Sequence, residues 1–486
     1  MKSKNEKAKL IQNIYDLTPL QEGMLFHHLY NNESTGYIIQ ECYDVNSEMN
    51  LEFLDKALML LSMKHDALRT AIMYEKMKAP KQVVFKERKI ELSVEDLSGK
   101  NEDEQDKFTE QILASDLKRG IDLQKDSLMR LKYINLGGKS TLLFTSHHII
   151  IDGWCSNTVT AEFLDFYLKL NDGMPFDSLK KAIIDERAHN CEYVDYINWL
   201  KKQSKSKGME YWKNLLADYD NIAEIKPMQK PEHSDEQVKN MEIIIPEKYV
   251  TKLLDIIKNT GSTINTAAEV IWGLTLQSYM REKDVVFGKV VSGRNADIDG
   301  IENIVGLFVN TIPVRINVNE NDTFSNLLKN QQIQGTNSSE YDFLSLSDVQ
   351  NFTEQKSEFI KTLFVFQNYF SGAEPEKDEI DSDESGFGFK LRTMREQTEY
   401  PITVQSACFG NVFLFEIKYD PNIYVESEIK LILDRILKIS EEVADNPDVP
   451  FNKLEKVTEK EKELILNDFN ATETEYPRDK TVVELF

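Results

Sequence analysis

The chain has 486 residues, which is enough for two or three domains of about 150 residues each. Hydrophobic residues make up 41% of it and aromatic residues 10%, so a sizeable core is expected and wholesale disorder is excluded. Its 58 Lys and Arg residues against 82 Asp and Glu residues give a formal net charge of −24. Such a charge argues against a nucleic acid as the main ligand, although it leaves room for a partner that docks on a local basic patch.

The cysteine pattern and the N-terminus predict a cytoplasmic protein. The four cysteines, Cys42, Cys155, Cys191 and Cys408, include no pair at CxxC spacing, so neither a zinc ribbon nor a dithiol redox motif is predicted. So few cysteines in so long a chain are typical of reduced thiols. The basic start of the chain is not followed by an apolar signal core, and no run of 18 apolar residues occurs, so neither secretion nor a membrane span is expected.

Helical and strand patterns alternate along the chain, which predicts an α/β protein. Gly137-Gly138 separates two strand-like runs and predicts a hairpin turn between them. Ser262 is predicted to cap the helix that follows it. In chain order, the expected elements are a helix over 51–64, strands over 128–136 and 141–149, a helix over 156–170, a helix from 262 to about 280, a strand over 285–291 and a helix over 425–443.

Three composition shifts indicate boundaries or loops. Residues 171–185 are predicted to cross between two lobes, and the acidic run 374–385 is predicted to be a solvated loop. Residues 458–486 lose the periodic pattern and are predicted to be a linker toward a domain that is absent from this sequence.

The stretch Ser146-His147-His148-Ile149-Ile150-Ile151-Asp152-Gly153-Trp154 carries the strongest chemical signal, because it directly follows an apolar strand. If the strand runs through the histidine pair, His147 and His148 point to opposite faces, so one reaches a reaction channel while the other packs on structure. Asp152 lies beyond the strand end, where its carboxylate either orients a histidine or locks the turn through an arginine. Gly153 gives a tight turn or room for a ligand. A metal site is not expected, because ligands on adjacent strand positions diverge and no third His or Cys is near. His27 and His28, in an apolar helix-like stretch, are predicted to be partly packed.

The HHxxxDG pattern after a strand resembles the condensation domains of nonribosomal peptide synthetases and their relatives, the chloramphenicol acetyltransferase-like acyltransferases. Further segments resemble the same family in the same order and together cover about residues 14 to 420. They are residues 17–27 (LTPLQEGMLFH), 64–70 (KHDALRT), 193–200 (YVDYINWL), 292–294 (SGR), 305–313 (VGLFVNTIP), 364–368 (FVFQN) and 396–401 (EQTEYP).

The resemblance implies two acetyltransferase-like lobes in a V-shaped pseudo-dimer with a central channel. We expect a docking-like segment over 1–13, an N-terminal lobe over 14–175 and a C-terminal lobe over 176–457. The implied reaction is attack by the amine of a carrier-bound acceptor aminoacyl thioester on the carbonyl of a carrier-bound donor thioester, which forms an amide. The implied partners are an upstream donor carrier, a downstream acceptor carrier and an adenylation domain. The substrates arrive on phosphopantetheine arms, and no cofactor is expected on this chain.

The resemblance also implies roles for single residues. His148 matches the catalytic histidine and His147 its structural neighbour, with Asp152 and Gly153 in the same motif. Arg294 is the candidate partner of Asp152. A further set is implied to line or support the channel: Asn368, Trp154 and Ser292. The residues after Asn368, Tyr369-Phe370, depart from the Pro of some members.

Two roles stay open for His148. It is either a general base toward the attacking ammonium or the zwitterionic intermediate, or a group that positions the amine and stabilises the tetrahedral intermediate. An α-amine titrates at about 7.7–8.0, so much of the nucleophile is available without help.

The subtype and two alternative functions also follow from the resemblance. The forms LTPLQEGMLFH and DGWC look like domains that accept a donor ending in a D-residue. The alternatives are a stand-alone CoA-dependent acyltransferase of the same fold and a non-catalytic platform that recruits tailoring enzymes. The first needs no linker, and members of the second kind usually lose the second histidine.

Overall fold

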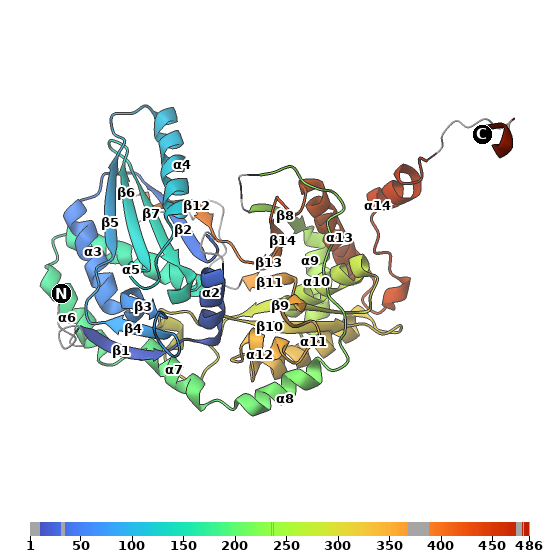
Figure 1. Ribbon diagram of the computed structural model, residues 1–486, viewed down its shortest axis with the longest axis horizontal. Coiled ribbons are helices and arrows are strands. Elements are labelled where there is room, and N and C mark those ends of the chain that lie inside the picture. Colours follow the sequence, from blue (N-terminus) through green and yellow to red (C-terminus); the bar gives the residue numbers. More distant parts are fainter. Residues whose placement is uncertain are drawn as a thin grey trace. The chain divides into compact units, whose positions relative to one another are not determined.

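The computed structural model describes residues 10–30, 35–234, 236, 238–367, 388–472, 479 and 481–485. Helices and strands alternate along these residues, so the predicted α/β class is confirmed (Figure 1). The chain forms two compact units. Unit 1 consists of Met1–Ile222, Phe287–Val314 and Thr336–Thr403, and unit 2 of Ala223–Val286, Arg315–Gly335 and Val404–Phe486. The predicted lobe boundaries remain a prediction, as does the docking role of residues 1–13, of which 1–9 lie outside the described part and 11–13 belong to strand β1.

A five-stranded sheet forms the centre of unit 1, with strand order β12-β2-β7-β6-β5. Its strands are β2 (Ile38–Val45), β5 (Glu91–Asp96), β6 (Met129–Asn135), β7 (Ser140–His147) and β12 (Lys390–Arg395). All eight residues of β7 are buried, and this middle strand pairs antiparallel with both its neighbours. The predicted hairpin is present: β6 and β7 are joined through Gly137 and Gly138, whose φ angles are +76° and +83°.

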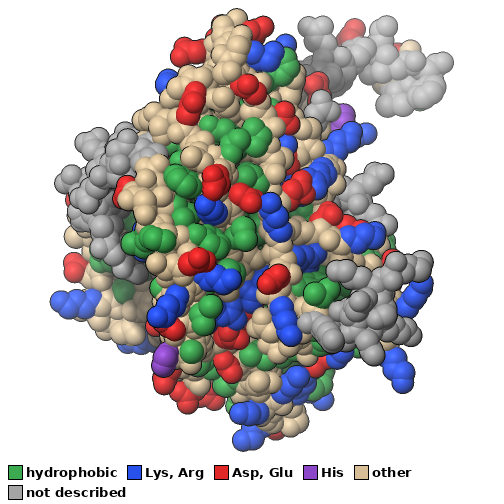
Figure 2. All heavy atoms as spheres, turned by 90° about the vertical axis from the view of Figure 1, so that its left-hand side faces the viewer, with side chains coloured by type: hydrophobic (Ala, Val, Ile, Leu, Met, Phe, Trp, Pro, Cys, Tyr) green, Lys and Arg blue, Asp and Glu red, His purple; other side chains and the backbone are tan. Residues whose placement is uncertain are grey.

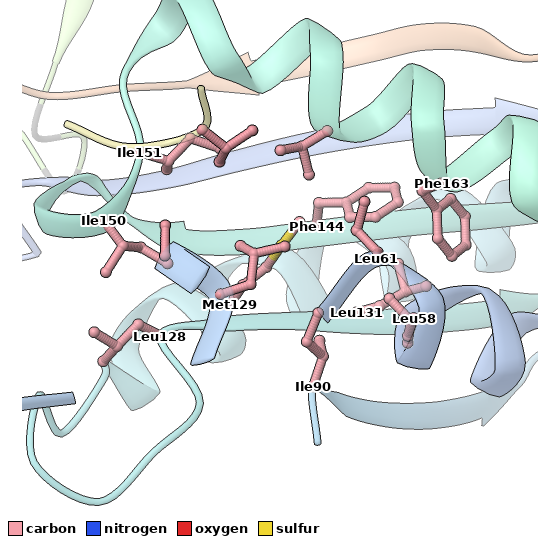
Figure 3. Packing of buried hydrophobic residues seen from close by; sticks show 14 of the residues in the cluster. Leu58, Leu61, Ile90, Leu128, Met129, Leu131, Phe144, Ile150, Ile151 and Phe163 are labelled. Carbon is pink, nitrogen blue, oxygen red and sulfur yellow. The ribbon is translucent and has the colours of Figure 1, made fainter. Parts of the chain in front are cut away.

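Two helices cover one face of this sheet with apolar side chains. They are α3 (Leu51–Lys64), which spans the predicted residues, and α5 (Gly153–Asn171), which begins three residues earlier than predicted. Figure 3 shows Phe144 of β7, Phe163 of α5 and Leu61 of α3 pointing toward one another. The two aromatic rings meet edge to face with centroids 5.2 Å apart. This packing holds α5 against β7.

The opposite face carries helix α4 (Glu102–Arg119) and a buried polar network. Asp116 of α4 accepts hydrogen bonds from Arg130 of β6 at 2.9 Å, from Thr145 of β7 at 2.7 Å and from Gln40 of β2 at 3.2 Å. A buried carboxylate is tolerated here because these donors satisfy it. Leu143, whose side chain alternates with that of Phe144, packs on Leu113 of α4.

Two other sheets complete the strand topology. A three-stranded sheet has the order β1-β4-β3, and a six-stranded sheet the order β10-β9-β11-β13-β14-β8. Their strands are β1 (Ile11–Asp16), β3 (Thr70–Met73), β4 (Lys81–Phe85), β8 (Lys239–Ile245), β9 (Asp284–Val291), β10 (Asn310–Asn317), β11 (Thr362–Gln367), β13 (Ile402–Phe409) and β14 (Val412–Tyr419). The predicted strand 285–291 is confirmed as β9.

Unit 2 contains the predicted helices near residues 262 and 425. Helix α10 (Ile264–Met280) is capped by Thr263, whose side chain accepts a hydrogen bond from the amide of Thr266, so the predicted cap at Ser262 is wrong by one residue. Helix α13 (Glu426–Asp445) packs with α9 (Glu247–Thr260), and Arg435 of α13 forms a buried ion pair with Glu461 of α14 (Glu459–Glu463).

The remaining helices are α2 (Pro19–Tyr30), α6 (Phe176–Arg187), α7 (Tyr193–Lys202), α8 (Lys205–Leu215), α11 (Phe324–Ser339), α12 (Leu346–Gln350) and α15 (Val482–Leu485). None of the helices in the described ranges is long and apolar enough to cross a membrane.

Candidate active site

The histidine pair lies where strand β7 changes into helix α5. β7 ends at His147, residues His148–Ile150 form one turn of 3-10 helix, and α5 begins at Gly153. The predicted strand over 141–149 is therefore two residues too long. The His148 amide donates to the Tyr37 carbonyl at 2.7 Å, which holds this turn against the chain that precedes β2. The two imidazoles leave the backbone from different local conformations, so strict strand alternation does not set their directions.

His147 belongs to the structure of the turn. Its residue is 2% exposed, and its Nδ1 accepts a hydrogen bond from the amide of Ile149 at 3.0 Å. The ring of His28 from α2 packs edge-on against it with centroids 6.0 Å apart, which agrees with the predicted packing of His28. Burial, with smaller contributions from His28 and His148, lowers the pKa of His147 to about 3. A neutral, enclosed ring of this kind supports the backbone and takes no proton at neutral pH.

His148 has a different environment, because its side chain is 13% exposed and meets a carboxylate. Nε2 of His148 lies 3.0 Å from Oε1 of Glu396. Burial acts to lower the pKa of His148, but the hydrogen bond and charge of Glu396, helped by the charge of Asp152, outweigh it and raise the pKa above 6.5. Nδ1 of the same ring is buried and has no hydrogen-bond partner among the side chains of the described ranges. The ring is therefore able to gain and lose a proton through Nε2.

Asp152 is fully buried and caps helix α5. Its Oδ1 accepts a hydrogen bond from the amide of Cys155 at 3.1 Å, and its Oδ2 accepts one from the amide of Phe308 at 3.0 Å. Nη2 of Arg294 lies 3.4 and 3.5 Å from the two carboxylate oxygens. The pair implied by the resemblance is present, and it joins the end of the histidine turn to residues 294–308.

Arg294 is held by backbone carbonyls and by an aromatic ring. Its Nη1 donates to the carbonyls of Ile301 and Ile304 at 2.6 and 3.0 Å, and its guanidinium lies 4.0 Å from the centroid of the Phe308 ring. Gly293 before it has φ +64°, and a Cβ there would lie 1.9 Å from the Phe308 carbonyl oxygen. Only glycine allows this approach, which explains the middle residue of Ser-Gly-Arg.

The other predicted site residues have varied surroundings. Ser292 is exposed, and its Oγ accepts a hydrogen bond from the Arg294 amide at 3.4 Å. Trp154 is 37% exposed and donates from Nε1 to the Glu302 carbonyl at 3.0 Å. Gly153 is the first residue of α5. Asn368 lies outside the described residues.

Glu396 is a site residue that sequence reasoning missed. It directly follows β12, whose last residue, Arg395, pairs with Gln40 of β2, while Ile38 of β2 pairs with His147. β12 thus delivers the next residue to the end of β7, and the Tyr37 amide donates to the Gln397 carbonyl at 3.4 Å. The signal available in the sequence was Glu396 itself, the first residue of the segment EQTEYP, which had been used only as part of the family resemblance. In the part of the chain that the structure describes, no group of three or more His, Cys, Asp or Glu side chains is arranged to hold a metal ion.

Comparison with known proteins identifies the family. The family model described as "Condensation domain" matches residues 11–466. The chain belongs to the condensation-domain family. It is 36% identical over 485 residues to tyrocidine synthase 3 of Brevibacillus parabrevis, and 32% identical over 489 residues to bacitracin synthase 3 of Bacillus licheniformis. Each alignment covers 99% of this chain but 7% of the relative, so the chain spans a small part of the synthases that it matches.

Solved structures show the same fold. The starter condensation domain of the rhizomide synthetase superposes with a TM-score of 0.69 at 15% identity, covering 92% of this chain and 100% of that one. A four-domain nonribosomal peptide synthetase bound to AMP and glycine also gives 0.69, at 13% identity, covering 93% of this chain and 34% of that one. The condensation-domain assignment and its acetyltransferase-like α/β fold are confirmed.

Family membership also confirms the general function predicted from the resemblance. Condensation domains of peptide synthetases are acyltransferases that form an amide between carrier-bound substrates. They work on phosphopantetheine-borne substrates, alongside carrier and adenylation domains.

Proposed function

We propose that this chain joins a donor aminoacyl or peptidyl thioester to the amine of an acceptor aminoacyl thioester, with His148 as the proton acceptor. The observation that carries the proposal is the contrast within the histidine pair. His147 is enclosed, with its pKa lowered to about 3, whereas His148 is partly exposed and its pKa is raised by a carboxylate 3.0 Å away.

A raised pKa favours a base over a group that only positions the substrate. An α-ammonium has a pKa of about 7.7–8.0, so a histidine whose pKa is above 6.5 comes closer to matching it. Proton transfer is most efficient when donor and acceptor pKa values are close. His148 therefore takes the proton of the acceptor ammonium, and the free amine attacks the donor carbonyl.

The residues around His148 hold it in place. Asp152 and Arg294 tie the histidine turn to the Phe308 backbone, and Gly153 is the first residue of α5 after the cap. Ser292 supports the backbone of Arg294, and Trp154 braces the loop that carries Glu302. Asn368 is proposed, on the resemblance alone, to be a channel residue.

The partners and the subtype are proposed from the family. An upstream carrier presents the donor, a downstream carrier presents the acceptor, and an adenylation domain charges the latter, with no cofactor or metal on this chain. The four cysteines are free thiols, which supports a cytoplasmic location. A D-configured donor terminus stays a prediction, which paired D- and L-donors on one carrier would decide.

The test is amide formation between defined donor and acceptor carriers. His148→Ala should lower the single-turnover rate by about 10²-fold or more. The matched control is His233→Ala, which removes an exposed histidine of unit 2 and should leave the rate unchanged. A folded His148→Ala with wild-type turnover would remove His148 from the mechanism. Product from CoA thioesters alone would favour the stand-alone acyltransferase, and no product from the wild type would favour the recruitment platform.

A further inference from the structure

The proposed mechanism assigns no role to Glu396, the charged group next to the His148 ring. Glu396 contacts Nε2, the atom through which His148 would exchange its proton. Nδ1 is buried and has no hydrogen-bond partner among the side chains that the structure describes. The Glu396 side chain is 22% exposed, more than the 13% of His148. An incoming amine therefore meets the carboxylate and Nε2 together.

Each of the other charged and titratable groups described nearby has a partner of its own or is in a state that favours neutrality. Asp152 is bound to Arg294 and to two backbone amides, and His147 is neutral with its Nδ1 occupied. His28, which faces His147 from α2, has its pKa lowered by burial. Glu41 of β2 accepts a hydrogen bond from Ser156, and burial, with a smaller effect of Glu396, raises its pKa.

Glu396 is thus the carboxylate whose position allows it to stabilise a positive charge at Nε2 of His148. We infer that Glu396 is the counter-ion that the His148 imidazolium and the α-ammonium of the acceptor share in turn. The inference rests on the proposed function and adds the acceptor's recognition element to it.

The proton balance follows directly. In the resting pair, Glu396 stabilises the imidazolium form of His148. The acceptor ammonium binds against the same carboxylate, and the second cation drives the imidazolium proton to water. Nε2 then takes one proton from the ammonium, the amine attacks the donor carbonyl carbon, a C–N bond forms and the C–S bond breaks. The attacking nitrogen loses one more proton, which ends on the departing thiolate, and His148 returns to the imidazolium form. One ammonium and one thioester give one amide, one thiol and one proton.

Two soluble probes separate this role from a structural one. Glycyl-pantetheine carries the ammonium, and glycolyl-pantetheine has a hydroxyl in its place on the same arm. The pKa of His148 is read by NMR of histidine-labelled protein, with the signal assigned by its loss in His148→Ala. Glycyl-pantetheine, at concentrations from which the wild type forms amide, should lower the His148 pKa, and glycolyl-pantetheine should not.

Substitution of Glu396 should abolish that difference. In Glu396→Gln the His148 pKa should fall below its wild-type value, both probes should act alike, and amide formation should drop by about 10- to 100-fold. The acidic limb of its pH–rate profile should move to lower pH. Glu396→Asp, which keeps the charge, should retain the ammonium effect. Glu399→Gln, the same change at an exposed position three residues along, should match the wild type.

Each contrary result has its own meaning. If the wild type forms no amide, the proposed function fails. If the wild type forms amide, but Glu396→Gln keeps its rate and its His148 pKa, or both probes shift the wild-type pKa equally, the role of Glu396 fails while the proposed function stands.

Discussion

His147 and His148 are neighbours in the chain with opposite acid–base character, because one ring is enclosed and the other meets a carboxylate. Burial, with smaller contributions from His28 and His148, favours the neutral form of the His147 ring, whose Nδ1 accepts a hydrogen bond from a backbone amide. The His148 ring meets a carboxylate, which favours its charged form. The contributions of the two rings to the free energy of unfolding should therefore change with pH in opposite directions.

For His147 the effect is a loss of stability in acid. Its pKa is about 3 in the folded chain and about 6.5 in an unfolded one, so between these values the unfolded state binds more protons. Its contribution is present above pH 6.5 and is lost as pH falls toward 3, at up to about 1.4 kcal/mol per pH unit. In His147→Asn, Oδ1 can accept the Ile149 bond but takes no proton.

The melting temperature of the wild type should thus fall toward that of His147→Asn as pH drops from 7 to 4. Two curves that stay parallel over this range would show that His147 does not resist protonation. His148 has the opposite sign, because its raised pKa gives a contribution that is present below pH 6.5 and is lost as pH rises through the folded value.

For single residues, the sequence predicted that His147 packs on structure and that Asp152 pairs with Arg294, since all three lie within motifs. It did not predict Glu396, because the contact depends on the pairing of β12 with β2, and no local periodicity reports a partner 248 residues away. The end of β7 at His147 was missed for a related reason. Ile149 and Ile150 extend the apolar run, but they pack from a 3-10 turn rather than from a strand.

The Ser-Gly-Arg turn is the element that secures the site, and its glycine gives a direct test. Gly293→Ala places an alanine in the left-handed region, which lowers the free energy of unfolding by about 1–2 kcal/mol. It also places a Cβ 1.9 Å from the Phe308 carbonyl oxygen, so the backbone has to move. Gly138 has a similar φ of +83°, but a Cβ there meets nothing within 4 Å. Gly293→Ala should therefore cost at least twice the free energy of unfolding that Gly138→Ala costs, measured by denaturant titration.

The two variants should differ in activity as well. The Phe308 amide donates to Asp152, so displacing Phe308 loosens the cap below the histidine turn. Gly293→Ala should form amide more slowly than Gly138→Ala at equal folded fraction. Equal costs for the two substitutions would contradict the close approach.

Elements with strong local signals were predicted well, and those that depend on tertiary pairing were not. Residues 51–64 have helical spacing and an Asn50 cap, and the helix has these bounds. The Gly137-Gly138 turn fixed the hairpin register. β12 has no alternating burial, with an exposed or half-buried residue at every position, so its sequence gives little sign of a strand.

The charge of the whole molecule bears on how carriers reach it. Carrier proteins tend to be acidic, and this chain has a net charge of −24, so the two repel at long range. Figure 2 shows one face on which basic and acidic side chains are interspersed. The basic segment with Lys2, Lys4, Lys7 and Lys9 is therefore predicted to supply local attraction.

Deleting residues 1–10 should slow transfer from a free upstream carrier and leave a directly fused donor carrier unaffected, because fusion supplies the effective concentration. Raising the salt concentration should mimic the deletion, since exposed charges are screened over about 8–10 Å. Rates for free and fused donors would be compared in single-turnover assays. An equal loss for both would indicate that the segment supports the fold instead.

The pairing of β12 with β2 also determines how late during synthesis this sheet can be completed. β2 ends at Val45 and β12 begins at Lys390, so a ribosome adding about 5–20 residues per second needs roughly 20–70 s to supply the second strand after the first. During that interval the outer edge of β2 has no strand to pair with, and an open edge invites pairing with other nascent chains. The active site is also incomplete throughout, because Glu396 is made just after β12. The edge of β2 therefore stays open during synthesis for longer than many small domains take to fold.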